Sequence, residues 1–450
     1  MLSWNNPKFK KCERVKEDYK DIVIDNVDIF CGTEDGVIEN GRIYISQGLI
    51  NAVEKKENII PPSDCRIING KGMTVLPGLI DTHLHLSWNG VFESYPVFFG
   101  EPLADRLSRN AWLTLKSGVT TAREMPGFGS IKLKLSIEKG EVQGPRLLVS
   151  TPALTVTGGY LGYPWWGIVI KDIDKIGQII AEKVKSGCDF IKTVAPYADA
   201  LKMQANISNE ILSRIVQEAK RFDLKVAAHT LWPEGLGVAI DAGVSSIEHC
   251  PSYVGGIIAD EVFIKAKEKG IFFIPTVDLL RRNYMIFNET ETLLEEKEYQ
   301  QNMPAKSLGK MLKMVEEMKK AQMMKKEVKE AFDQLFQNYK EHYAENFQKA
   351  LKYGVKITAG TDSGSNYTPH GILAKELEMY VKLGMTPEQA ILSATKVSAE
   401  LLGMEKEVGT LEPGKKADVI LVNGSPHKDI TALQDIQSVI KEGVIVFSKS

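Results

Sequence analysis

The chain has 450 residues, of which 43% are hydrophobic and 25% charged, and its formal net charge at pH 7 is -2. This ordinary globular composition provides no basic surface for nucleic acid or anionic lipid, so we expect neither nucleic acid nor a membrane as a partner. The length exceeds that of one ordinary core and suits a large barrel with a smaller unit beside it.

The sequence shows neither a targeting signal nor a disulfide spacing. The first 20 residues are polar and charged, and the sequence contains no run of about 18 apolar residues, so we expect a soluble, non-secreted protein. The cysteines are odd in number and form no CxxC pair, which argues against a disulfide framework and predicts the reducing cytoplasm as the location. They are Cys12, Cys31, Cys65, Cys188 and Cys250.

The two ends of the chain share one pattern of short apolar segments separated by turns. Within residues 1–75, short alternating apolar segments such as DIVIDNVDIF are separated by turn-like stretches such as GTEDG, which is typical of antiparallel strands. Residues 404–450 repeat this pattern in KKADVILVNG and EGVIVFSK. Because chain ends often lie close together, we expect both segments to pair into one small β-sandwich beside the barrel.

Residues 76–403 show a different pattern, in which short apolar strands alternate with amphipathic helices. This alternation is typical of a parallel sheet, and helices ending in glycine precede several of the strands. Eight such strands predict an α/β fold of the (β/α)₈ TIM-barrel type. The expected strands are residues 79–85, 119–123, 146–150, 190–194, 225–228, 246–248, 271–276 and 356–360.

A helical insertion at about residues 279–353 interrupts this rhythm. It is rich in Lys, Glu, Met and Gln and contains the stretch KSLGKMLKMVEEMKKAQMMKKEVKEAFDQLF. The composition favours solvated helices that pack a methionine stripe on the barrel, with a lid or an oligomer contact as the alternatives. We expect the protein to be a homo-oligomer.

Polar residues that suit a metal gather at the ends of the expected strands. His83 and His85 lie two apart at the end of the first strand, so their side chains share a face. An HxH pair alone is a weak signal. His229 and His249, however, follow the fifth and sixth strands, and Asp362 follows the eighth. Because the C-terminal strand ends of a barrel share one face, these five residues are expected to form a metal site.

Lys192 lies in the fourth expected strand, within the apolar stretch DFIKTV. Burial lowers the pKa of a lysine by disfavouring its charged form, and a neutral amine can add CO₂ to become a carbamate that binds metal. The alternatives are an ion-paired lysine and one that extends its amine to the surface.

The motifs GLIDTHLHL, GVTTARE, CDFIK, AAHT, SSIEHC and AGTDSG, in this order, resemble those of the amidohydrolase superfamily. The resemblance is greatest to its prolidase-like branch, which has a binuclear centre bridged by a carboxylated lysine, and it spans about residues 76–403, with LEPGKKADVILV matching the returning β segment. It implies two divalent metal ions and a CO₂-derived carbamate. In these terms His83, His85 and Asp362 hold one metal, His229 and His249 hold the other, and Lys192 bridges both.

Two positions depart from the branch pattern. Tyr160 in TVTGGY stands where the branch often has TGGH, which puts in doubt any role that needs an imidazole there. Arg123-Glu124 stands where the branch usually has an Arg-Asp pair. The longer side chain of Glu124 matters only if its carboxylate contacts a ligand.

The resemblance implies a hydrolase of C–N amide bonds, acting on a dipeptide or an N-acyl amino acid. A cyclic amide or carbamate hydrolase, a mononuclear deaminase-like enzyme and a non-catalytic scaffold are the alternatives. In the expected mechanism a metal-bridging hydroxide attacks, Asp362 accepts its proton and passes it to the leaving nitrogen, and Tyr160 donates to the oxyanion. Zn²⁺ is the first choice of metal, although Mn²⁺, Co²⁺ and Fe²⁺ also suit these ligands.

Further candidates lie in loops after the strands. His370 follows Asp362 and is either loop structure or a support of the site. Arg281 or Arg282 could clamp a substrate carboxylate, with a solvated pair as the alternative. Several aromatic residues either pack the barrel rim or line a substrate pocket. These aromatic residues are Tyr160, Tyr163, Trp165, Trp166 and Trp232.

Overall fold

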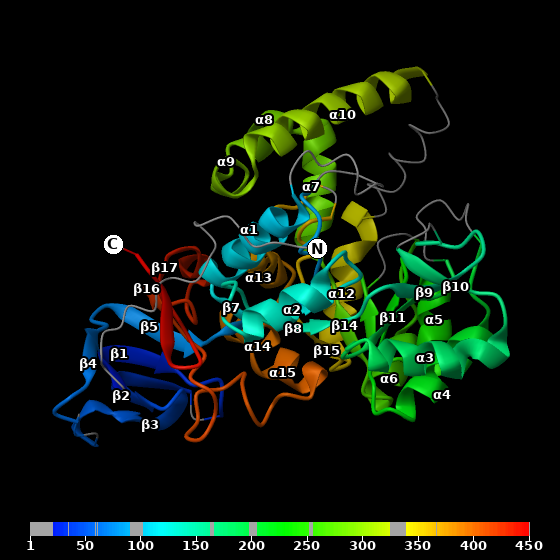
Figure 1. Cartoon of the computed structure of the whole chain (residues 1–450). Coiled ribbons are helices and arrows are strands. Elements are labelled where there is room, and N and C mark those ends of the chain that lie inside the picture. The colour runs from blue at the N-terminus through cyan, green and yellow to red at the C-terminus, as the bar shows by residue number, and fades with distance from the viewer. Residues whose placement is uncertain are drawn as a thin grey trace.

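The structure is a computed structural model, shown in Figure 1. It describes residues 21–34, 36–58, 60, 62–90, 102–162, 166–197, 205–251, 255–324, 339–365 and 367–449. The predicted pocket residues Tyr163 and Trp165 lie outside the described residues, as do residues 1–20.

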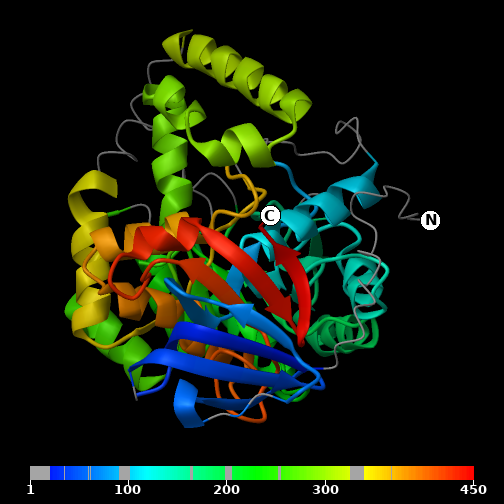
Figure 2. The same cartoon turned by 90° about the vertical axis from the view of Figure 1, so that its left-hand side faces the viewer.

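The strands from the two chain ends join in one sheet, and Figure 2 shows those of the N-terminal end beside those of the C-terminal end. In the described chain this sheet has eight strands in the order β18-β17-β16-β5-β1-β2-β3, with β4 also paired to β1. β5 and β16 pair antiparallel, so residues of both ends hydrogen-bond directly. The pairing of the ends is thus as predicted, and division of the sheet into a sandwich stays a prediction. The strands are β1 (Asp21–Phe30), β2 (Val37–Ser46), β3 (Leu49–Lys55), β4 (Arg66–Asn69), β5 (Met73–Pro77), β16 (Val419–Asn423), β17 (Ile436–Lys441) and β18 (Val444–Ser448).

All eight strands predicted for the central part of the chain are present and pair in parallel. They form two ladders, β6-β7-β8 and β11-β12-β13-β14-β15. Backbone hydrogen bonds connect the ladders at both edges, from Asp189 N to Val149 O at 2.8 Å and from Thr82 N to Ala359 O at 2.9 Å. The bounds are β6 (Leu79–Leu84), β7 (Val119–Glu124), β8 (Arg146–Val149), β11 (Ile191–Val194), β12 (Val226–His229), β13 (Ser246–Glu248), β14 (Phe272–Ile274) and β15 (Lys356–Ile357).

Two short strands that the sequence analysis missed follow β8. β9 (Ala153–Val156) pairs in parallel with β10 (Gly167–Ile170) and extends the second ladder beyond β11. The stretch between β9 and β10 contains Tyr160 and Trp166. This extension therefore adds aromatic residues beside the C-terminal ends of the strands.

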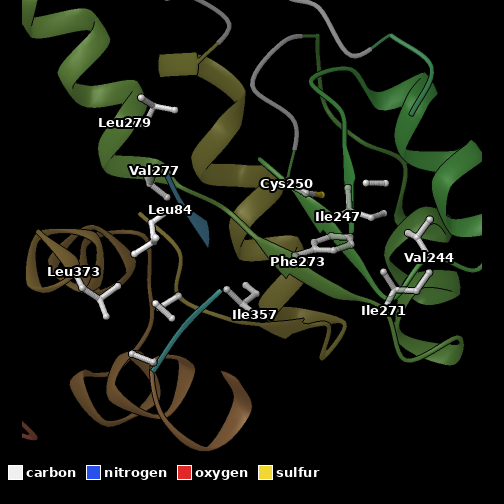
Figure 3. Packing of buried hydrophobic residues seen from close by; sticks show 14 of the residues in the cluster. Leu84, Val244, Ile247, Cys250, Ile271, Phe273, Val277, Leu279, Ile357 and Leu373 are labelled. Carbon is white, nitrogen blue, oxygen red and sulfur yellow. The ribbon is translucent and has the colours of Figure 1, made fainter. Parts of the chain in front are cut away.

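Helices connect consecutive parallel strands, as expected for repeated βα units. Gly243 shows how a helix passes into a strand, because its φ of 78° ends α5 in the left-handed conformation three residues before β13 begins. Buried side chains between helices and strands, such as Ile247, Phe273 and Leu373, form the main core (Figure 3). The helices are α1 (Leu103–Lys116), α2 (Ser130–Glu138), α3 (Ile176–Lys185), α4 (Asn209–Lys220), α5 (Pro233–Ala242), α6 (Asp260–Glu268), α13 (Leu373–Lys382), α14 (Pro387–Ser393) and α15 (Lys396–Leu402).

The insertion is helical, as predicted, and α10 projects from the top of the molecule in Figure 1. The insertion's buried methionines that the structure describes lie outside the main core. Met303 and Met311 belong to a separate buried cluster of the insertion, which Tyr367 of the loop after β15 joins. The described helices are α7 (Val277–Asn288), α8 (Thr290–Leu294), α9 (Lys297–Asn302), α10 (Ala305–Met324) and α12 (Ala344–Lys352). Residues 325–338 lie outside the described chain, and a lid or oligomer role stays a prediction.

Among the helices that the structure describes, none combines the length and the apolar character that a membrane span needs.

Candidate metal centre

The six predicted ligands meet at the C-terminal ends of the parallel strands. All six side chains line one cavity, and all six residues are buried. The rings of His83 and His249 have centroids 4.9 Å apart, and those of His229 and His249 lie 4.5 Å apart. Residues 279 positions apart in the sequence are thus in contact, since Asp362 Oδ1 lies 3.6 Å from His83 Nε2. The strand-end rule that predicted this site therefore holds in three dimensions.

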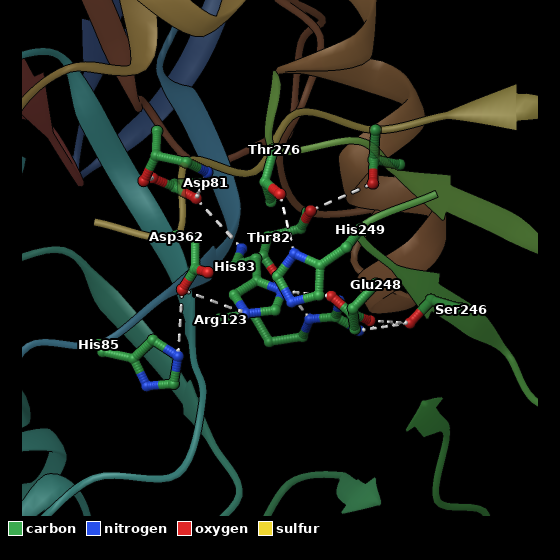
Figure 4. A network of polar contacts seen from close by, with 12 residues as sticks. Asp81, Thr82, His83, His85, Arg123, Ser246, Glu248, His249, Thr276 and Asp362 are labelled. Carbon is green, nitrogen blue, oxygen red and sulfur yellow. Dashed lines mark hydrogen bonds and ion pairs between the residues drawn. The ribbon is translucent and has the colours of Figure 1, made fainter. Parts of the chain in front are cut away.

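Three of these residues could together hold one cation. The ligand atoms of His83, His85 and Asp362 all lie within 4.8 Å of one another, and Asp362 Oδ1 is 3.2 Å from His85 Nε2 (Figure 4). Such a mixture of imidazole and carboxylate ligands suits a divalent transition metal.

The hydrogen bonds of the two histidines indicate where their protons lie. His83 Nδ1 donates to Glu248 Oε2 at 2.5 Å, and His85 Nδ1 faces the carbonyl oxygen of Pro126 at 3.2 Å. We therefore assign the protons to Nδ1, which leaves a lone pair on each Nε2. Burial, together with the nearby Lys192 charge, lowers the pKa of His83 well below its usual range, so this ring is neutral.

Asp362 Oδ1 consequently faces two lone pairs. This buried oxygen has no hydrogen-bond partner among the described residues, although both Nε2 atoms are near. Three electron pairs facing one another repel unless a cation lies among them. The residues present therefore fit a divalent metal.

A buried carboxylate that the sequence analysis missed supports His83. Glu248 Oε1 accepts hydrogen bonds from Arg123 Nη2 at 2.9 Å and Ser246 Oγ at 2.7 Å, while Oε2 accepts from His83 (Figure 4). Burial acts to raise the pKa of Glu248, but the charges of Arg123 and Lys192 and the hydrogen bond from Ser246 together outweigh it, so the pKa is lowered. An ionised carboxylate behind a ligating imidazole fixes the ring and increases its basicity. Arg123 thus affects the site through Glu248, because its charge helps to keep that carboxylate ionised.

His249 has a support of its own. Its Nδ1 lies 2.8 Å from Thr276 Oγ1, and Thr276 takes a left-handed φ of 49° just before α7 begins. The first two backbone N–H groups of α7, at Val277 and Asp278, donate to Glu376 at 2.7 Å each. The start of the helical insertion is therefore fixed directly beside a predicted metal ligand.

Lys192 is buried, as its apolar surroundings predicted. Its Nζ has no hydrogen-bond partner among the described residues, so neither an ion-paired lysine nor one that reaches the surface matches the structure. Burial lowers the pKa of Lys192 to about 8. Near pH 8, the Lys192 amine is therefore neutral in a substantial fraction of the molecules.

Aromatic rings flank the ligands on two sides. Tyr160 stacks on His229 with ring centroids 4.5 Å apart, and Trp88 stacks on His85 at 3.8 Å with an interplanar angle of 6°. Trp166 contacts Trp88 edge-on at 4.6 Å. The sequence analysis did not single out Trp88, although it lies only three residues beyond His85. Trp232 precedes α5 as its N-cap and is not among the described residues that line the cavity.

Arg281 and Arg282, for which a substrate clamp and a solvated pair were both open, form ion pairs within the insertion. Arg281 and Arg282 both bind Asp278, with Nε–Oδ distances of 2.6 Å, and both also pair with Glu296. Arg282 is fully buried and is not a solvated side chain either. Neither arginine is among the described residues that line the cavity.

His370 and Glu124 also have structural contacts. His370 Nε2 donates to Trp88 O at 3.0 Å, and burial lowers the pKa of His370 to about 3, so it is neutral. Glu124 accepts from Leu86 N at 2.7 Å and from Ser130 Oγ at 2.9 Å, and burial raises the pKa of Glu124 to about 8. Both residues hold the loop that follows His85, and neither is among the described residues that line the cavity.

Comparison with known proteins agrees with this geometry. The chain is 28% identical over 441 residues to the ochratoxinase of Aspergillus niger, covering 89% of this chain and 81% of that protein. It is 24% identical to the imidazolonepropionase of Geobacillus kaustophilus, covering 91% of each. A solved Xaa-Pro dipeptidase with methionine bound in its active site superposes with a TM-score of 0.74 at 27% identity, covering 95% of this chain and 100% of that one.

The model of the amidohydrolase family matches residues 74–446, which include both ladders of parallel strands and every predicted ligand. The chain therefore belongs to the amidohydrolase family and is a hydrolytic enzyme that acts on carbon–nitrogen bonds.

Proposed function

We propose that the protein hydrolyses the amide bond of a dipeptide or an N-acyl amino acid and releases the C-terminal residue. The observation that carries this proposal is the convergence of four histidines, an aspartate and an unpartnered lysine in one buried cavity. The similarity to a Xaa-Pro dipeptidase and to an ochratoxinase supports an amide substrate.

The proposed centre holds two divalent cations, with Zn²⁺ as the first choice. His83, His85 and Asp362 would hold one cation, His229 and His249 the other, and a carbamate on Lys192 would bridge them. The buried and unpartnered Nζ supports the carbamate, because a neutral amine can add CO₂ and two nearby cations would stabilise the resulting anion. Divalent cations bound there would supply a hydroxide nucleophile near neutral pH and polarise the scissile carbonyl.

The residues of the chain move the protons. Asp362 accepts a proton from the attacking water and gives it to the leaving nitrogen as the C–N bond breaks, so one residue acts as base and then as acid. Tyr160, stacked on His229, would donate its hydroxyl hydrogen to the oxygen on which negative charge develops. Water adds to the carbonyl carbon, and the products are a carboxylic acid and an amine.

The finer predictions about architecture belong to the same proposal. The backbone hydrogen bonds at both ladder edges support closure of the eight parallel strands into a (β/α)₈ barrel over residues 76–403. Residues 1–75 and 404–450 would form the accessory β domain. The thiols of Cys65 and Cys188 are free, which supports a cytoplasmic location. A homo-oligomer stays a prediction that light scattering would test.

Two measurements test the proposal together. Mass spectrometry of protein purified without added metal should find two divalent ions per chain, and a library of dipeptides and N-acyl amino acids should yield substrates that release the C-terminal residue. His229→Asn should lose metal, whereas the matched variant His342→Asn, in the π-helical turn Tyr339–Tyr343, should not. One metal per chain with no amide cleavage would instead favour a mononuclear deaminase-like enzyme.

A further inference from the structure

A second cavity lies where the helical insertion meets the C-terminal strands. Residues of α1, α9, α13, β17 and β18 line it, and Figure 2 shows the C-terminal strands, in red, below the helices of the insertion. Its volume is about 500 Å³, which lies within the range of sites that bind small molecules. Among the described residues, none lines both this cavity and the metal centre. The second cavity is therefore a separate site.

Four lysines line the second cavity. Two of them already form ion pairs, Lys375 with Glu378 and Lys449 with Asp435. The other two have no carboxylate partner in the described part of the chain. Lys116 Nζ lies 5.4 Å from the centroid of the Phe447 ring, and Lys297 Nζ donates to the backbone oxygen of Gln434 at 3.2 Å. Because neither contact supplies a negative charge, both ammonium groups can bind an anionic group of a ligand.

A buried carboxylate also lines the second cavity. Glu298 is 6% exposed, and its Oε2 makes no hydrogen bond among the described residues. Burying a carboxylate oxygen without a donor is unfavourable. A carboxylate only accepts hydrogen bonds, so the group that suits it is a donor, and an ammonium supplies both the N–H groups and the opposite charge.

The positive and negative groups start close together. Lys297 and Glu298 are the first two residues of α9, so their side chains leave the same helical turn. The remainder of the lining includes the apolar side chains of Leu113, Ile372 and Leu433. A ligand that uses the whole cavity therefore has an ammonium, an anionic group near it and an apolar part. These are the three groups of an amino acid with an apolar side chain.

We propose that the second cavity binds a free amino acid with an apolar side chain, whose ammonium is bound by Glu298 and whose carboxylate is bound by Lys116 and Lys297. The inference goes beyond the proposed function and does not depend on it, because it uses no residue of the metal centre. It assigns to the enzyme a binding site for a small zwitterion in addition to the site of hydrolysis.

Three ligands separate the two charged contacts, with affinities measured by isothermal titration calorimetry on the enzyme as purified. Leucine has both charged groups, 4-methylpentanoate is leucine without its ammonium, and 3-methylbutylamine is leucine without its carboxylate. None contains an amide bond, so the enzyme cannot hydrolyse them. Leucine should bind about 10- to 100-fold more tightly than either analogue, the expected gain from one hydrogen-bonded pair of charges.

Two variants assign each contact to its residue. In Glu298→Gln, leucine should bind no more tightly than 4-methylpentanoate, because its ammonium has lost the carboxylate. In Lys116→Gln, the advantage of leucine over 3-methylbutylamine should fall by about tenfold, because one of the two cations is lost. Glu291→Gln in α8 is the matched control, since it removes the same charge from the insertion outside the cavity, and it should leave all three affinities unchanged.

The stability of Glu298→Gln tests whether this carboxylate serves the fold instead. Its free energy of unfolding in urea should be no lower than that of the wild type, because a neutral amide is less unfavourable to bury than an unpartnered carboxylate. A marked loss of stability would overturn the inference, as would equal affinities of the wild type for the three ligands. If all leucine binding persists in both cavity variants, it occurs elsewhere, such as at the metal centre, and the inference is again overturned. These titrations involve no catalysis, so their outcome is independent of whether an amide is cleaved.

Discussion

Replacing Glu248 by glutamine should weaken metal binding without altering any predicted ligand. The carboxylate accepts hydrogen bonds from His83 at 2.5 Å and from Arg123 at 2.9 Å, and it is completely buried. Glutamine preserves the shape but removes the negative charge, so His83 loses the ion that orients it. Loss of such a partner behind a ligating histidine typically costs about 10- to 100-fold in metal affinity.

The same change should also reduce the stability of the metal-free protein. Arg123 is buried, and glutamine would leave its guanidinium charge without an opposite charge at this contact. Removing one member of a buried ion pair typically costs about 3 to 5 kcal/mol. The hydrogen bond from Arg123 Nε to Thr82 O at 2.6 Å remains, so we expect the lower part of that range.

Competition with a chelator measures the metal affinity, and urea unfolding of the metal-free protein measures the stability. Glu218→Gln is the matched control, because Glu218 is also buried and pairs with two arginines, Arg214 at 3.0 Å and Arg221 at 2.9 Å, yet does not line the cavity. The control should lose some stability and no metal affinity. Wild-type metal affinity in Glu248→Gln would refute the role assigned to this carboxylate.

Three further predictions concern the centre and the insertion. Asp362→Asn should retain metal but lose about 10² to 10⁴ in kcat, since an amide can bind a cation but cannot carry the proton; near wild-type turnover would show that another group does so. Lys192→Ala should lose metal and activity, and added acetate or propionate should partly restore both. Lys192→Arg should not be rescued in this way, because its permanent charge repels the cations. Two metals and normal turnover in Lys192→Ala without an added carboxylate would exclude the carbamate. Deleting residues 307–336 and joining the ends by a short loop should leave metal content unchanged, because no predicted ligand lies there, and a folded but metal-free product would contradict this separation.

The ligands could be predicted because each depends on a local rule. A short apolar strand that ends in a polar residue is visible in the sequence, and the barrel rule brings such ends together without knowledge of any contact. His249 and Asp362 were identified in this way, and both have positive φ values, of 62° and 53°, just beyond their strands.

The supporting residues could not be predicted, since they depend on contacts between distant segments. Arg123 and Glu248 lie 125 positions apart, and nothing in either local sequence indicates the other. The ion pairs of Arg281 and Arg282 could not be predicted either. The turn between α8 and α9 brings Glu296 beside both arginines, whereas the sequence suggested a helix exposed to solvent. The strands β9 and β10 were missed because the glycine- and aromatic-rich stretch that they flank lacks an alternating apolar pattern.

The pairing of β5 with β16 has a consequence for biosynthesis. β5 continues through Gly78 into β6, the strand that carries His83, and Gly78 N donates to Asp418 O at 2.8 Å. Thr74 in β5 likewise contacts Gly424, 350 residues later. At a translation rate of about 5 to 20 residues per second, β5 waits roughly 20 to 70 seconds for these partners to be synthesised. Such a high contact order slows folding. The segment that leads into the HxH strand therefore acquires its final neighbours only after the ribosome has translated past residue 424.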